Sequence, residues 1–164
     1  MDCSNGKGVS REGHELDFIG GAAGMNMGTR FIATKEAPVH DNVKQALVAA
    51  TELDTRLVMR ALRNTERVLK NNGVDRLIEI ERQKGAKLQI ADIHNEVAGV
   101  YPKVMIDGDM DAGAWSCGMV VGLIKDIPTV KELIDRIMVD AERIILDRLA
   151  GFVGAEGKAA LRVA

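Results

Sequence analysis

The residue pair with the clearest capacity for chemistry is Gly28-Thr29, which follows the short apolar run Met25-Asn26-Met27. A glycine lets the backbone approach an anion such as a phosphate without a Cβ in the way, and a threonine supplies an amide and a hydroxyl as donors. The same pair suits an ordinary glycine between a strand and a loop, followed by a threonine turn. Spacing alone favours this second interpretation, so the pair is at this point only a candidate phosphate cradle.

Composition excludes several functional classes. The formal net charge of −2 argues against a nucleic-acid-binding protein, because such domains usually carry a basic excess. Cys3 and Cys117 form no CxxC pair, and His40 and His94 have no partners at ligand spacing, so we predict neither a disulfide framework nor a metal site. No apolar run approaches the roughly 20 residues that span a bilayer, and residues 1–13 lack a signal-peptide core. We therefore expect a cytoplasmic protein without a membrane partner.

The order of apolar and turn residues predicts an α/β chain. Residues 1–21 are expected to be irregular, because they show no apolar period. The clearest element comes last: Thr129 and Glu132 have the spacing of a capping box, and apolar residues follow at helical spacing as far as Phe152. The other expected elements are a buried strand within 25–33 that runs into a loop, a helix capped by Asp41, a strand or helical turn at 57–59, helices at 74–83 and 90–97, and an extended segment at 104–106 that enters a turn.

Three motifs, taken together, resemble the nitronate monooxygenase (2-nitropropane dioxygenase-like) family in their order and approximate spacing. The motifs are Gly24–Thr34 with its continuation to Lys44, then Arg60–Thr65, then Gly108–Ser116 followed by Gly118-Met119 and Gly122–Ile124. The likeness covers about residues 24–154. It implies the C-terminal portion of a (β/α)8 TIM barrel with additional C-terminal helices, and FMN bound at the C-terminal ends of the barrel strands.

The resemblance gives the candidate cradle a role. Residues 25–27 would form the last barrel strand, and Met27, Gly28 and Thr29 would bind the FMN phosphate on a loop that commonly seats phosphate in such barrels. It identifies no catalytic residue. Glu12-Gly13-His14 looks like the context of the family's catalytic histidine, but its spacing to Gly28 is too short for His14 to serve as the base.

The segment around Trp115 resembles the part of the family that folds back over the flavin. Trp115, Ser116 and Met119 are therefore candidate walls of a substrate pocket, although a lone tryptophan is more often a core residue. Many relatives carry a glutamine in place of Met119, and a methionine offers no amide hydrogen bonds there. The polar residues of Arg60–Asn64 either organise the loop around the cofactor or are solvated charges beside a turn asparagine.

The activity that the resemblance implies is the FMN-dependent oxidation of alkyl nitronates with O2 to carbonyl compounds and nitrite. The flavin carries the redox chemistry, and the protein orients the substrate. Two alternatives share the fold: an NADH:quinone reductase, whose substrate is a quinone, and an FMN-dependent enoyl-thioester reductase. A small nucleotide-binding module is excluded, because neither a Walker A motif nor a dinucleotide glycine fingerprint is present.

Length limits these expectations. A closed (β/α)8 barrel takes about 250 residues, and this chain has 164. Because the upstream half of the family and its glycine-rich strand-7 loop have no counterpart, we expect a truncated or frame-disrupted relative that holds FMN weakly or not at all. The alternative class is a non-catalytic α/β fragment completed by another chain. The expected division is an irregular segment at 1–21, the barrel portion at 22–154 and a flexible tail at 155–164.

The terminal helix generates a prediction about assembly. Its apolar stripe, which includes Leu133, Ile137 and Ile144, must pack against something, and part of the usual barrel surface is missing. Burying one such side chain is worth roughly 1.5–3 kcal/mol, so we expect a homo-oligomer or an aggregation-prone monomer. Sedimentation equilibrium over a wide concentration range tests this. A monomer with a cooperative melt and no binding of a hydrophobic dye would contradict it.

Overall fold

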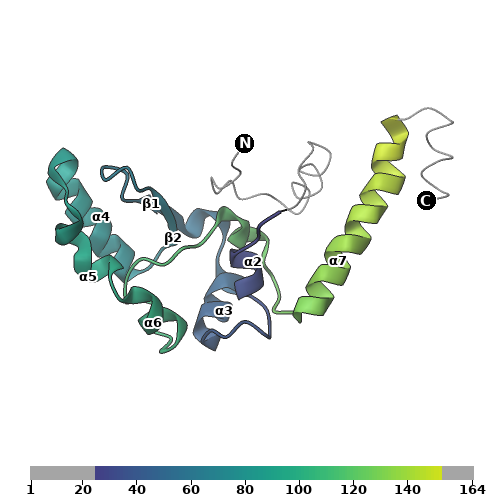
Figure 1. Ribbon diagram of the computed structural model, residues 1–164, viewed down its shortest axis with the longest axis horizontal. Helices are drawn as coiled ribbons and strands as arrows, with labels where there is room; N and C mark the ends of the chain where they lie inside the picture. The colour runs from purple at the N-terminus through teal and green to yellow at the C-terminus, as the bar shows by residue number, and fades with distance from the viewer. Residues whose placement is uncertain (1–24, 153–164) are drawn as a thin grey trace. The chain divides into compact units, whose positions relative to one another are not determined.

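The computed structural model describes residues 25–152, which belong to two compact units (Figure 1). The first unit ends at Ile127 and the second begins at Pro128, and each is described by itself. The first contains, in chain order, α2 (Thr29–Ile32), α3 (Asp41–Ala49), η1 (Glu52–Asp54), β1 (Thr55–Val58), β2 (Glu66–Leu69), α4 (Asn72–Lys84), η2 (Gly85–Lys87), η3 (Ile90–Ile93), α5 (His94–Val97), α6 (Val100–Met105) and η4 (Met119–Leu123). The second contains α7 (Val130–Arg143), a π-helical turn (Ile144–Arg148) and a 3₁₀ turn (Leu149–Phe152).

Strands β1 and β2 form an antiparallel hairpin in which Thr55 lies opposite Leu69. Of the two alternatives for residues 57–59, the strand is therefore correct as far as Val58. Met59 and Arg63, with φ of 58° and 55°, lie in the connection between the strands. Left-handed backbone is uncommon for residues other than glycine, so this connection holds a conformation that its sequence does not favour.

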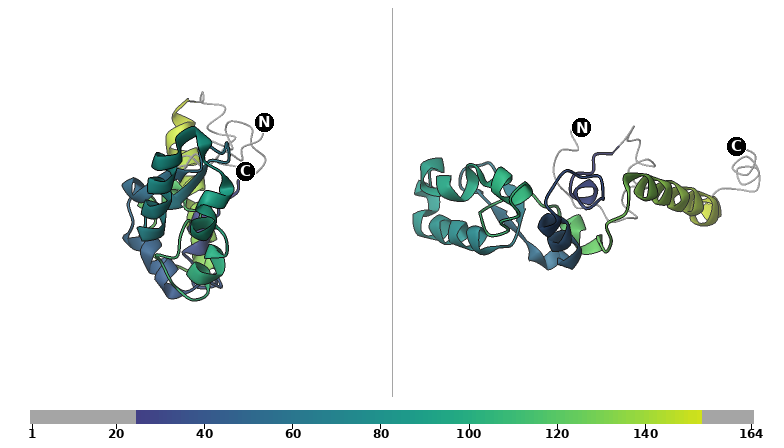
Figure 2. Two further views of the ribbon diagram at one scale, coloured as in Figure 1. Left: turned by 90° about the vertical axis from the view of Figure 1, so that its left-hand side faces the viewer. Right: turned by 90° about the horizontal axis from the view of Figure 1, so that it is seen from below.

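A short third segment runs along the other edge of β2. Ser116 forms an isolated antiparallel bridge with Val68, and the Cys117 amide donates to the Arg67 carbonyl at 2.9 Å. Helices α4 and α5 pack against each other beside the hairpin (Figures 1 and 2). Backbone hydrogen bonds thereby attach the third motif to β2.

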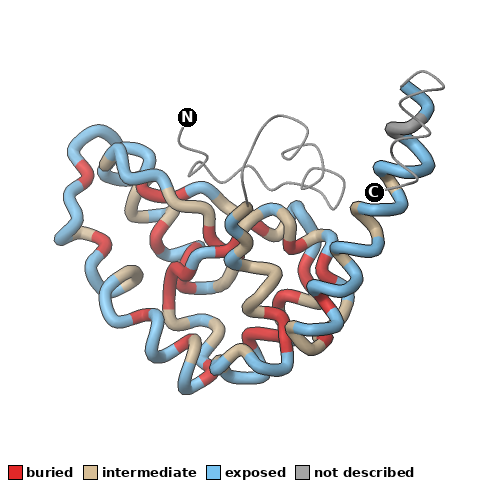
Figure 3. Tube along the Cα trace, turned by 45° about the vertical axis from the view of Figure 1, so that its right-hand side comes forward, coloured by how far each residue is buried: buried red, intermediate tan, exposed pale blue. Residues whose placement is uncertain are grey.

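Two apolar clusters form the core of the first unit, and the buried positions alternate with exposed ones along its chain (Figure 3). The larger cluster draws on α3, α6 and η4, and the smaller one on the hairpin and α4. The larger consists of Ala33, Val43, Leu47, Ala50, Leu69, Val100, Val104, Trp115, Cys117, Val121 and Ile124. The smaller consists of Val58, Met59, Val68, Val74, Leu77, Leu88, Ile93 and Ala114.

Two expected extended segments are wrong. Residues 104 and 105 lie in α6, where Val100 and Val104, four residues apart on one helical face, are both buried. Their packing outweighs the preference of β-branched residues for strands. Residues 25–27 are not a strand either. Strand backbone needs a hydrogen-bonding neighbour, and the sheet of the described chain consists of β1 and β2 alone.

The expected helices are present with changed boundaries. The helix at Asp41 begins there, but the cap is His40, whose Nδ1 accepts a hydrogen bond from the Asn42 amide at 3.1 Å. The helix expected at 74–83 lies within α4, whose cap is Asn71. The segment 90–97 divides into η3 and α5.

The capping box of α7 is confirmed. The Glu132 amide donates to Thr129 Oγ1 at 3.1 Å, and the Thr129 amide donates to Glu132 Oε2 at 2.8 Å. Leu133 is buried, whereas Ile134 and Met138 are 46% and 56% exposed. These two apolar side chains are exposed, and the assembly of the chain stays a prediction.

Residues 25–152 show neither a membrane-spanning helix nor a metal site. No helix there combines the length and the apolar character that a membrane crossing requires. No group of three or more His, Cys, Asp or Glu side chains in that range is arranged to bind a metal ion.

The packing around Cys117 generates a prediction. Its side chain is in the larger cluster, and burial raises the pKa of the thiol to about 12. Because the thiolate is the reactive form, this pKa leaves roughly a thousandfold less of it at pH 8 than an ordinary cysteine has. We expect iodoacetamide to label the peptide that carries Cys117 only after urea unfolds the chain, as followed by mass spectrometry. Equal labelling rates with and without urea would contradict the core described above.

Candidate functional site

The candidate phosphate cradle at Gly28-Thr29 lies where the third motif contacts the first, through Gly118. Gly28 is exposed and precedes α2, and a Cβ built on it meets no atom within 4 Å. The Gly118 amide donates a hydrogen bond of 2.9 Å to Thr29 Oγ1. The amides of Phe31 and Ile32 donate to the Gly28 carbonyl at 3.0 and 3.2 Å, which turns the chain into α2 directly after the open glycine.

A second contact holds the same two segments together. The guanidinium of Arg30 donates to the Asp126 carboxylate at 2.8 Å and to the Asp126 carbonyl at 3.1 Å. The Arg30 side chain is only 13% exposed, so this ion pair is partly shielded from water. Charge-assisted hydrogen bonds are stronger than neutral ones, and this pair anchors the end of the first unit to α2.

Helix η4 fills the space between these two contacts. It packs against α2, α3 and η1. A Cβ on Gly122 would lie 2.7 Å from the Glu52 backbone nitrogen, so a glycine is required for this approach. Met119, at the start of η4, is 41% exposed, and Met27 is partly exposed.

The residues expected to wall a pocket have different surroundings. Trp115 is fully buried in the larger cluster, and its indole nitrogen has no hydrogen-bond partner among the residues that the structure describes. This placement fits the core alternative that the sequence left open. Ser116 is exposed and hydrogen-bonded. Neighbouring residues of one short segment thus face the core and the solvent in alternation, as in a strand.

Two residues that sequence reasoning missed surround Ser116. The phenol of Tyr101, on α6, donates to Ser116 Oγ at 2.7 Å and accepts from the Ser116 amide at 3.0 Å. The hydroxyl of Ser116 donates to the carboxylate of Glu66, the first residue of β2. No local pattern links positions 66, 101 and 116, so only the folded chain brings them together.

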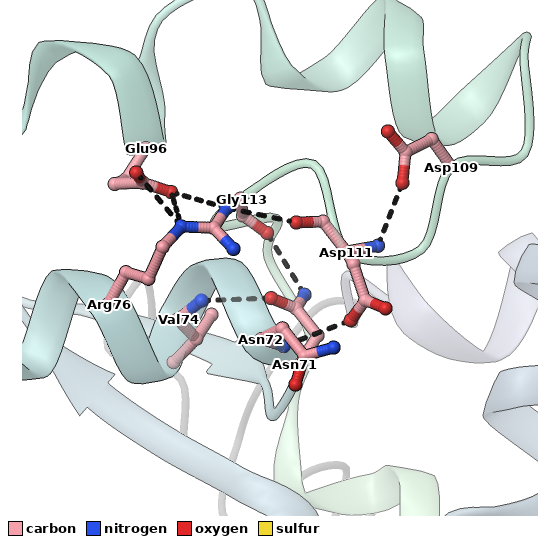
Figure 4. A network of polar contacts seen from close by, with 8 residues as sticks. All are labelled: Asn71, Asn72, Val74, Arg76, Glu96, Asp109, Asp111 and Gly113. Carbon is pink, nitrogen blue, oxygen red and sulfur yellow. Dashed lines mark hydrogen bonds and ion pairs between the residues drawn. The ribbon is translucent and has the colours of Figure 1, made fainter.

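The acidic loop of the third motif is a structural junction (Figure 4). The Asn71 side chain accepts from the Val74 amide at 2.9 Å and donates to the Gly113 carbonyl at 3.0 Å. Asp111 accepts from the Asn72 amide at 2.9 Å. The start of α4 is therefore fixed to this loop from two directions.

An arginine on α4 completes the junction. Arg76 donates to both carboxylate oxygens of Glu96 and to the Asp111 carbonyl (Figure 4). The hydrogen bonds with Glu96 raise the pKa of Arg76. This bidentate pair joins α4 to α5.

The second motif lies in the connection of the β1–β2 hairpin. Its polar residues Arg60, Arg63 and Asn64 are exposed. The Arg63 amide donates to the Arg60 carbonyl at 3.1 Å, which closes a turn. The hairpin connection supports the turn alternative for these residues.

The family of the chain follows from its match to a family model. The model described as nitronate monooxygenase matches residues 9–140, and the chain belongs to that family. Two curated relatives carry the name (3aS,4S,5R,7aS)-5-hydroxy-7a-methyl-1-oxo-octahydro-1H-indene-4-carboxyl-CoA dehydrogenase, one from Rhodococcus jostii (strain RHA1) and one from Mycobacterium tuberculosis (strain ATCC 25618 / H37Rv). Each is 29% identical in an alignment of 155 positions. The alignment covers 74% of this chain and 44% of the relative. The chain thus spans less than half the length of these relatives.

The fold is similar to solved structures of FabK from Thermotoga maritima. The TM-scores are 0.76 for FabK and 0.72 for a point mutant of it, at 26% identity. The likeness covers 88% of this chain and 45% and 42% of the two FabK chains. The expectation of an α/β chain that forms part of a TIM barrel is confirmed.

The junction generates a prediction at Gly113. Its φ is 154°, and an added Cβ would lie 2.4 Å from the Glu96 carbonyl oxygen. Gly113→Ala should therefore lower the free energy of unfolding by about 2 kcal/mol or more, from strain and overpacking together. Gly99→Ala is the matched control, because Gly99 lies in the left-handed helical region, with φ 68° and ψ 11°, but has nothing within 4 Å of its Cβ. We expect about 1 kcal/mol there. Urea titrations that gave equal losses for both variants would contradict the close packing.

Proposed function

We propose that this chain carries the phosphate-binding part of an FMN-dependent oxidoreductase of the nitronate monooxygenase type. The observation that supports this most is the hydrogen bond from the Gly118 amide to Thr29 Oγ1 beside the open Gly28. It joins two motifs of the family at a point with room for an anion. FMN, when bound, supplies the redox chemistry.

The residues at this point fit a phosphate group. Thr29 Oγ1 accepts from Gly118, and among residues 25–152 nothing accepts the hydroxyl hydrogen of Thr29. That hydroxyl hydrogen is the donor that we propose for a phosphate oxygen. Gly28 leaves the approach open because it has no Cβ. Met27 precedes this cradle and is part of the proposed site.

The substrate proposed first is an alkyl nitronate, oxidised with O2 to a carbonyl compound and nitrite in the cytoplasm. Ser116 and Met119, both exposed, are the proposed substrate-side residues, and Trp115 supports their segment from the core. The protein's part is to orient the substrate and to exclude competing reactions.

A second candidate is an oxidoreductase that acts on a thioester of coenzyme A. The two curated relatives named as carboxyl-CoA dehydrogenases favour it. The two functions separate in one assay with the purified chain, FMN and O2. Nitrite released from a propyl nitronate supports the first function, and flavin bleaching by a hydroxyacyl-CoA under nitrogen supports the second. The absence of both nitrite release and flavin bleaching would contradict both functions.

FMN binding supplies the direct prediction. Because the chain covers less than half of its relatives, we expect weak binding, with a Kd above the micromolar range. Gly28→Val should weaken it at least about tenfold, about 1.4 kcal/mol, since a branched side chain blocks the amides. Gly151→Val is the matched control, because Gly151 also has nothing within 4 Å of its Cβ. An unchanged Kd for Gly28→Val, measured by flavin fluorescence on a folded variant, would remove Gly28 from the site.

A further inference from the structure

The exposed cluster of Tyr101, Ser116 and Glu66 has the form of a proton relay. The phenol donates to the serine hydroxyl at 2.7 Å, and the serine hydroxyl donates to the carboxylate. Every donor in the series points toward Glu66, an acceptor when ionised. A proton delivered at the phenol oxygen can therefore be passed to the carboxylate by two short transfers, from phenol to serine and from serine to carboxylate.

The relay is held by backbone contacts on both sides of the serine. The Leu69 amide donates to the Trp115 carbonyl at 3.4 Å, and the Cys117 amide donates to the Arg67 carbonyl at 2.9 Å. The Ser116 amide donates to the phenol oxygen at 3.0 Å, which fixes the position of Tyr101. These backbone hydrogen bonds hold the hydroxyl groups of Ser116 and Tyr101 in a fixed geometry.

The cluster is open to a small molecule and close to the candidate cradle. Tyr101 is 45% exposed, so its phenol can be reached from solvent. Ser116 precedes Gly118 by two residues, which separates their Cα atoms by about 7 Å at most. Gly118 in turn binds Thr29. A substrate beside a cofactor held at Thr29 therefore lies within reach of the cluster.

We propose that these three residues remove a proton from a carbon acid, either a nitroalkane or an acyl thioester. The proposal rests on the proposed function, since it names the substrate chemistry of the same site. The C–H bond next to the nitro or carbonyl group breaks, and its electron pair moves to an oxygen of that group. The proton goes to the Tyr101 oxygen as the phenol proton passes to Ser116 and the serine proton to Glu66. One proton moves from carbon to carboxylate, and no electrons leave the substrate.

The same hydrogen bonds also join α6 to the edge of β2, so loss of stability alone does not test the relay. The rate of hydrogen–deuterium exchange at the acidic carbon of a substrate tests it directly. We would incubate the full chain without flavin or O2 in D2O with nitroethane or with acetyl-CoA, and follow the loss of the α-proton signal by NMR. A general base of this kind typically contributes about a hundredfold or more.

We expect the chain to accelerate exchange above the buffer rate, and Tyr101→Phe and Glu66→Gln each to lower this rate at least about tenfold. Both variants preserve shape, and glutamine still accepts from Ser116. Glu79→Gln is the matched control, a carboxylate on α4 that pairs with Arg82 outside the cluster. The fluorescence of Trp115, the single tryptophan, checks that each variant is folded.

Each outcome decides the proposal. Exchange of nitroethane alone, of acetyl-CoA alone, or of both supports the relay and identifies the carbon acid. A wild-type rate equal to buffer, or a rate that survives Tyr101→Phe, overturns it. A parallel FMN titration separates the two proposals: FMN binding without exchange contradicts the relay only, and exchange without FMN binding contradicts the proposed function only.

Discussion

A single hydrogen bond, from the Gly118 amide to Thr29 Oγ1, joins two segments that are 89 residues apart in the chain. The segment that carries Gly118 has little regular structure, so its position depends on contacts of this kind. The Arg30–Asp126 ion pair adds a second anchor at the end of the same segment. The hydrogen bond and the ion pair together hold residues 116–126 against α2. They therefore hold Ser116 and the exposed start of η4 in the same part of the fold as Gly28. The proposed phosphate site and the proposed proton relay both depend on these two contacts.

Close backbone packing is the other constraint on this arrangement. A Cβ on Gly73 would lie 2.4 Å from the Cα of Gly113, and one on Gly108 would lie 2.4 Å from the His40 ring. Such approaches are open only to glycine. They place the acidic loop between α3 and α4, where Asn71 and Arg76 then satisfy its polar groups. The third motif of the family is thus largely structural in this chain, and only its last residues face the candidate site.

The sequence predicted the elements whose signals are local. The capping box at Thr129 and the apolar period after it define α7. Residue type and spacing alone favoured an ordinary turn at Gly28-Thr29, and the cradle that the family resemblance suggests there stays a prediction. Residues 104–106 misled because β-branched residues suit strands, whereas burial of two of them on one face selects a helix. The Tyr101 relay was invisible, because its three members are 15 to 50 residues apart and meet only through the bridge to β2. Contacts of long sequence separation leave no mark in local spacing.

We propose that the contact between Thr29 and Gly118 builds a site for the phosphate of FMN. The most direct test compares the dissociation constants of FMN and riboflavin for the same chain, since the two ligands differ only in the phosphate. We expect FMN to bind at least about tenfold more tightly, a difference of about 1.4 kcal/mol. We also expect Thr29→Val to remove most of this difference and to leave riboflavin binding unchanged. Equal affinities for the two ligands, or a preference for FMN that persists in Thr29→Val, would contradict it.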